Sequence, residues 1–222
     1  MTESKSYLRG AFIAYEPGGY PNGNKQVIPF RFNPETLARA FQVEQGKSGS
    51  GTEAKKGAGK GDQGADAAGG TVKQSITVQV RFDFDDRHQG LDGLPAELGI
   101  LPEVSALESL LFPAETASDA NSDGKEPVKA KKERPTVLFV WGKKRVLPVR
   151  ITGMNINETR FNAELNPTRA EVDVALEVLG ETDAKDNKAV SDALSFTASK
   201  RSEAAKSFFD NTSSQSGTIL PL

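Results

Sequence analysis

The residues closest to a reactive cluster lie together near the middle of the chain: Asp83, Asp85, Asp86 and His88. Carboxylate and imidazole groups at this spacing could hold a metal ion or act as acid and base. A calcium loop would need a ligand where Arg87 stands, and it would need a glycine that is missing here. We therefore interpret the cluster as the solvated end of a strand, and the sequence predicts no metal site.

Nucleophilic catalysis and nucleotide binding both lack residues that they require. The chain has no cysteine, its only histidine is His88, and no serine stands in a G-x-S-x-G motif. Gly59 to Gly64 matches the dinucleotide pattern G-x-G-x-x-G. A dinucleotide site requires a strand before this motif and a helix after it, but low-complexity sequence lies on both sides. A P-loop requires a serine or threonine after its lysine, and Gly61 stands at that position. The sequence thus predicts no catalytic residue and no cofactor.

One enzymatic alternative stays open. Glu158 and Glu164 could act as the acid and base of a small hydrolase or carbohydrate-active domain. That chemistry would require a concave pocket around the two carboxylates. Without a sequence signal for such a pocket, we expect a protein that is not an enzyme.

Two oppositely charged segments are candidates for an interface between subunits. A basic corner follows Trp141 and Gly142, and an acidic strand comes later, where charged residues alternate with valines. The corner is either a solvated hairpin tip beside an aromatic anchor or a contact for the acidic strand of a neighbour. A net charge of −2 argues against nucleic acid as a partner. The candidate interface residues are Lys143, Lys144, Arg145, Glu171, Asp173 and Glu177.

The elements that would position these residues are mostly strands. Alternation of apolar and polar residues predicts a mainly β (α+β) fold, a β-sandwich or half-barrel with one or two short helices. The parity of the apolar residues changes across Gly153, which predicts a β-bulge there. Strands are expected at residues 7–15, 26–32, 75–85, 136–141, 149–156 and 169–179, and helices at residues 33–41 and 101–112.

Polar, low-complexity segments interrupt and follow this β domain of residues 1–180. Residues 45–74 and 114–134 are expected to form flexible insertions, and residues 181–222 a polar extension with at most a weakly amphipathic helix. The hydrophobic fraction of 36% is low because of these segments. No apolar stretch has the length or position of a signal peptide or membrane span, so we expect assembly in the cytoplasm and no membrane partner.

Several motifs in order resemble one family, the tube-like N-terminal domain of baseplate proteins in contractile injection systems. These phage-tail-like devices contain an inner tube that ends at a spike hub. The resemblance spans roughly residues 7–180. It is carried by residues 29–36 (PFRFNPET), 99–111 (GILPEVSALESLL), 138–142 (LFVWG), 145–150 (RVLPVR) and 165–170 (LNPTRA).

The resemblance implies a structural adaptor that forms a six-membered ring and joins the inner tube to the spike hub and baseplate. Its implied partners are copies of itself and the tube, hub and baseplate wedge proteins, with incorporation into a phage-tail-like particle. Many relatives continue into a LysM module, for which residues 181–222 are too short and too polar. A repeating inner-tube subunit is the structural alternative, which the long insertions make less favourable because stacked rings leave little room for them.

Overall fold

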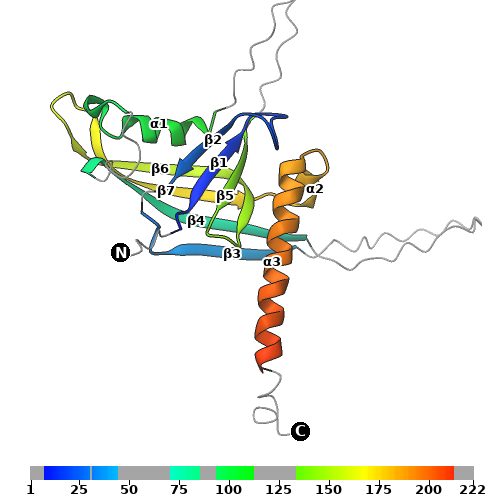
Figure 1. Ribbon diagram of the computed structural model, residues 1–222. Coiled ribbons are helices and arrows are strands. Elements are labelled where there is room, and N and C mark those ends of the chain that lie inside the picture. Colours follow the sequence, from blue (N-terminus) through cyan, green and yellow to red (C-terminus); the bar gives the residue numbers. More distant parts are fainter. Residues whose placement is uncertain (1–7, 31, 45–70, 86–93, 113–133, 213–222) are drawn as a thin grey trace, which may run out of the picture.

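The computed structural model describes residues 8–30, 32–44, 71–85, 94–112 and 134–212. The expected flexible loop at residues 45–70 and nearly all of the second insertion lie outside these described residues. The described part forms one curved antiparallel sheet, a half-barrel, which confirms the mainly β fold (Figure 1). Its strand order is β2-β1-β5-β6-β7-β4-β3.

The strands are short at one edge of the sheet and long in its other half. Strands β6 and β7 pair along most of their length, and β7 also pairs with β4. The strands are β1 (Ala11–Tyr15), β2 (Lys25–Pro29), β3 (Leu37–Glu44), β4 (Thr71–Asp83), β5 (Thr136–Val140), β6 (Val146–Phe161) and β7 (Pro167–Val178). The helical elements are η2 (Ala96–Leu98), α1 (Leu101–Ser109), α2 (Glu181–Ala184) and α3 (Lys188–Thr212).

The core lies on the concave face of the sheet and follows the alternation of β4 and β7. In the observed register Val78 lies opposite Val174 and Val80 opposite Val172, and all four side chains are buried. Cross-strand apolar pairs of this kind are the main packing unit of a sheet. The alternation seen in the sequence therefore identified the buried face of both strands correctly.

Strands β5 and β6 also behave as the sequence predicted. Phe139 of β5 packs in the main core, whereas Leu138 faces the other side and contacts Ala193 of α3. This two-sided burial explains why β5 is apolar on both faces. The register of β6 against β7 shifts between Ile151 and Gly153, which confirms the predicted bulge.

The helix expected at residues 33–41 is wrong. Asn33 and Pro34 have the chemistry of a helix start, but the chain enters β3, which pairs with β4 from Leu37 to Glu44. Long-range pairing thus overrides a local capping signal. Strand β4 begins at Thr71, so the first insertion ends earlier than residue 74.

Helix α1 covers the concave core and is held by a close backbone contact. Gly99 has φ +56°, and a Cβ there would collide with the carbonyl oxygen of Pro167. The next residue, Ile100, donates its backbone N–H to that same oxygen at 2.7 Å. Val104 and Leu107 are buried as expected, and Leu110 is buried in place of the expected Leu111.

The C-terminal extension contains the long helix α3 (Lys188–Thr212), where the sequence predicted at most a weakly amphipathic helix. The first half of α3 packs on the convex side of β5 and β6 (Figure 1). The Thr197 hydroxyl accepts a hydrogen bond from the backbone N–H of Val146 at 3.1 Å, and the Asp192 carboxylate accepts one from the Tyr20 hydroxyl at 3.1 Å. The extension is therefore attached to the β domain through its first helical turns.

Candidate functional site

Asp83, which the sequence placed at a solvated strand end, is buried and ion-paired. Its carboxylate accepts hydrogen bonds from Arg169 Nε at 2.7 Å and from Arg81 at 3.2 Å. Burial by itself would raise the pKa of Asp83, but these bonds and the backbone N–H of Asp85 outweigh it, and the pKa lies below its usual value. In the part of the chain that the structure describes, no three acidic or histidine side chains gather to hold a metal ion.

The carboxylates of the hydrolase alternative do not form a site. Glu158 is exposed on β6 and Glu164 is exposed in the turn between β6 and β7. Neither lines the hollow beside Trp141 or the hollow beside Arg150. The arrangement gives this alternative no support.

The basic corner is a tight turn between β5 and β6. Gly142 adopts φ +66°, a conformation that glycine allows without steric cost. Lys143 and Lys144 are exposed, and Arg145 is half-buried. Trp141 packs its indole against Phe139, with ring centroids 5.9 Å apart, and is a partly buried neighbour of the main core, as the aromatic-anchor interpretation expects.

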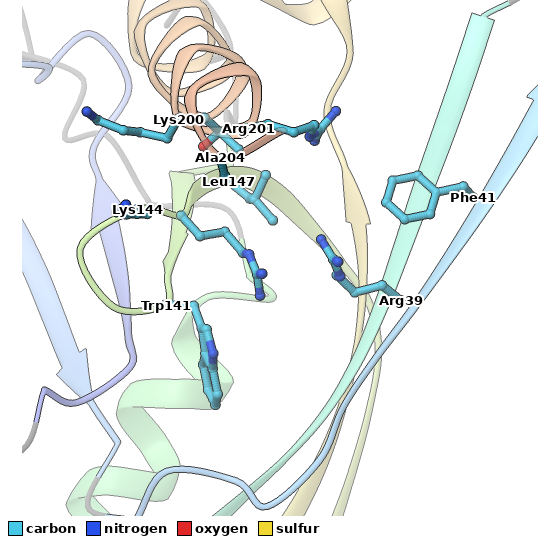
Figure 2. A pocket seen from close by; sticks show the side chains of 10 residues that line it. Arg39, Phe41, Trp141, Lys144, Leu147, Lys200, Arg201 and Ala204 are labelled. Atoms are coloured by element: carbon cyan, nitrogen blue, oxygen red, sulfur yellow. The ribbon is translucent and has the colours of Figure 1, made fainter. Parts of the chain in front are cut away.

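The other side of Trp141 borders a hollow of about 560 Å³ where three separate elements converge. Figure 2 shows Arg39 extending from β3 toward the space between Trp141 and α3, with Lys200 and Arg201 carried by the helix. The curvature of the sheet brings its β3 edge to this place. The lining residues are Arg39, Phe41, Trp141, Lys144, Arg145, Leu147, Thr197, Lys200, Arg201 and Ala204.

The lining of this cationic pocket includes five cations and no carboxylate. Lys200 has an acidic partner just outside, Glu203, at 2.8 Å. Within the described residues the other four make no ion pair. Burial, and then the nearby charges of Arg39 and Arg201, lower the pKa of Arg145 below its ordinary value. Among the described residues, Arg39, Arg145 and Arg201 thus lie near one another without an ion pair, while Glu203 offsets part of the charge of Lys200 and Lys144.

The acidic strand does not contact the basic corner within the chain. Glu171 and Asp173 are exposed on β7, and Asp173 accepts a hydrogen bond from Gln79 at 2.9 Å. Glu177 lies 3.5 Å from Arg150 of the neighbouring strand. Glu177 therefore has a partner in its own fold, and its role between subunits stays a prediction.

Strand β3 and the start of β4 form an exposed apolar ribbon at one edge of the sheet. Val43 lies opposite Val72 in the register, and these side chains are 68% and 58% exposed. Phe41 is also about half exposed. Within the described sheet, β3 and β2 are the two edge strands, so their outer backbone groups have no strand partner.

Beyond Arg201 and Ala204, which line the cationic pocket, the second half of α3 projects away from the sheet. Residues 201–211 are exposed throughout, including the adjacent rings of Phe208 and Phe209. In Figure 1 this half of the helix extends well past the sheet. The two phenylalanine rings, 63% and 64% exposed, form a small apolar patch near the end of the described helix.

A sequence model of the contractile injection system tube protein matches residues 11–189, most of the chain. The chain belongs to the contractile injection system tube protein family. The match ends at the start of α3, so nearly all of that helix lies beyond it. No curated protein matches this chain.

Two solved tail structures show distant similarity to this tube-family protein. One is the tail of an empty gene transfer agent particle with C6 symmetry, with 14% identity and a TM-score of 0.28. The other is a native gene transfer agent virion, with 13% identity and a TM-score of 0.27. Each comparison covers 77% of this chain and 91% of the other.

The cationic pocket of this tube-family protein was only partly visible in the sequence. Lys144 and Arg145 were singled out, but Arg39, Lys200 and Arg201 were not. Arg39 lies in a segment expected to be a short helix, and the other two lie in the polar extension, for which at most a weak helix was expected. A possible signal was the spacing of Thr197 and Arg201, which places both on one helix face. None of the described helices is both long and apolar enough to span a membrane.

Proposed function

We propose that this protein forms a ring that joins the inner tube of a contractile injection system to its spike hub and baseplate. The observation that carries this proposal is the projecting half of α3. It lies beyond the family match, and it offers an exposed surface with Phe208 and Phe209 at its end. A tube-type domain that carries an additional protein-binding helix is suited to a junction between unlike neighbours.

The ring itself would form through the two edges of the sheet. The β3 edge of one subunit can pair with the β2 edge of the next, a head-to-tail contact that closes into a ring when the rotation permits. Such pairing would satisfy the outer backbone groups of both strands. It would also cover the apolar ribbon of Phe41, Val43 and Val72. A hexamer is the ring size that the family resemblance implies.

Charge contacts between copies complete this proposed interface. Glu171 and Asp173 remain exposed on β7, and Lys143 and Lys144 remain exposed at the basic corner. Replacing Glu171 and Asp173 by lysine should leave the circular dichroism spectrum unchanged and reduce ring formation, because like charges would then face each other. Reversal of Lys143 and Lys144 to glutamate in the same chain should restore it. Unchanged ring formation by the first variant at low salt would show that the acidic face meets only solvent.

The junction role is tested by assembling particles without this chain. If the protein is an adaptor, tubes should still polymerise but should lack an attached hub in electron micrographs. The alternative role, a repeating tube subunit, predicts that no tube forms at all. That second outcome would overturn the proposed function. In a repeating stack, α3 would have to fit between every pair of rings. The described residues give no support for such an arrangement.

A further inference from the structure

The cationic pocket has an unbalanced charge that the fold by itself does not explain. Arg39 comes from β3, Lys144 and Arg145 from the β5–β6 corner, and Arg201 from α3. Bringing like charges together from three elements costs electrostatic free energy, most of all for the half-buried Arg145. Such an arrangement is typical of a site completed by an anionic group from outside.

The walls between these cations are apolar. Trp141, Leu147 and Ala204 line the pocket, and Phe41 continues from it to the exposed ribbon of Val43 and Val72. A simple inorganic anion would neutralise the charge but would leave this apolar surface in contact with water. The occupant that fits both features carries carboxylates and an apolar side chain.

A buried amide on β4, opposite the lining residue Phe41, also lacks a hydrogen-bond partner among the described residues. Gln74 lies directly opposite Phe41 in the β3–β4 register and is only 7% exposed. Its side-chain Nε2 makes no hydrogen bond with any described residue. Buried polar groups are normally hydrogen-bonded, so this edge of the sheet contains a polar group that its described surroundings leave unsatisfied.

We propose that the cationic pocket binds an extended acidic peptide segment of a neighbouring protein in the particle. The segment would place at least one carboxylate among Arg39, Arg145 and Arg201 and an apolar side chain against Trp141. This proposal depends on the proposed function in one respect: it assumes that the neighbouring protein is another component of the particle. A volume of about 560 Å³ accommodates a few side chains of such a segment.

Other occupants fit less well. Nucleic acid would require a basic surface that follows successive phosphates, whereas this chain has a net charge of −2 and the cations converge on one hollow. The acidic strand of a second copy is paired on both sides within its sheet, so Glu171 and Asp173 cannot enter a hollow between three elements without unfolding β7. An extended segment has the shape that the pocket admits.

The test uses Trp141, the only tryptophan of the chain, as the reporter. The peptide acetyl-Glu-Glu-Leu-Glu-Glu-amide is titrated into the isolated full-length protein while the indole emission is recorded. The same titration is made with the neutral peptide acetyl-Gln-Gln-Leu-Gln-Gln-amide, with inorganic phosphate and with a short DNA duplex. We expect a saturating change with the acidic peptide that weakens as salt is added.

Arg39→Gln and Arg145→Gln, on two different elements, should each weaken binding about tenfold or more, the usual loss for a hydrogen bond to a charged group. Arg160→Gln removes an exposed arginine from the far end of β6 and should change binding less than about twofold. Circular dichroism verifies that the three variants are folded. Arg39 and Arg145 lie on separate elements. If one variant misfolds, the other still shows whether the pocket binds the peptide.

The proposal is overturned if the acidic peptide produces no saturating change, or if the neutral peptide binds as tightly. It is also overturned if Arg160→Gln weakens binding as much as the pocket variants. Tighter binding of phosphate or DNA than of peptide would assign the pocket to that ligand instead. All measurements use unassembled protein, so they are independent of ring position. A protein that binds the peptide but lies elsewhere in the particle would contradict only the proposed function.

Discussion

Replacing Val43 and Val72 by lysine should abolish ring assembly while leaving the subunit folded. The two side chains lie opposite each other on the exposed β3–β4 ribbon and are 68% and 58% exposed, so the single subunit loses little by their replacement. In a ring, each valine would bury apolar area worth about 1.5 kcal/mol or more. Their combined loss raises the concentration needed for assembly about a hundredfold.

Leu165→Lys provides the matched control for this result. Leu165 is an exposed apolar residue in the β6–β7 turn, 79% exposed, and it lies outside the edge strands. Its replacement should leave assembly unchanged. Sedimentation velocity measures the ring fraction, and circular dichroism measures the fold. Rings formed equally by the double variant and the wild type would show that the ribbon is not an interface.

Asp83→Asn should be among the most destabilising single substitutions of a polar residue. The substitution removes the negative partner of Arg169 and Arg81 at a position where the carboxylate is almost fully buried. The variant loses charge-assisted hydrogen bonds worth about 1.5–3 kcal/mol, while Arg169 and Arg81 stay partly in contact with water. Chemical denaturation should reveal this loss. The exposed neighbour Asp85→Asn should cost less than about 0.5 kcal/mol, and equal costs at the two positions would contradict the account.

The same pair makes stability depend on acidity. The pKa of Asp83 in the folded chain lies below its usual value of 3.8. The ionised carboxylate therefore contributes its full stabilisation above that usual value, and this contribution disappears as the pH falls through the lower folded-state pKa. The difference in unfolding free energy between wild type and Asp83→Asn should accordingly shrink on acidification through this range. If the difference in unfolding free energy stays constant over this pH range, the ion pair is not the source of the stability difference.

The sequence predicted the strands whose packing follows a local pattern. The alternation of β4 and β7, the two-sided burial of β5 and the bulge at Gly153 were all visible from residue types. The strand β3 was not, because Asn33 and Pro34 supply a helix-start signal and the pairing with β4 that overrides it comes from residues beyond a long insertion. Pairing over such separations leaves little trace in local periodicity.

The pocket and the ion pair were missed for a related reason. Asp83 and Arg169 are adjacent only because β4 pairs with β7, and the strand alternation alone placed Asp83 on the solvent side. The cationic pocket combines β3, the β5–β6 corner and α3, which are far apart in the chain. Net charge and local composition carry no information on such convergence, so the sequence indicated only the basic corner.

The most direct test of the central claim is to locate the chain within assembled particles. Particles built with a short-tagged version of the protein can be labelled with nanogold and imaged by cryo-electron microscopy. The proposed junction role predicts label at one end of the tube, where the tube meets the spike hub, and a single additional ring in the density there. Label distributed along the full length of the tube would contradict it and would make this protein the repeating tube subunit.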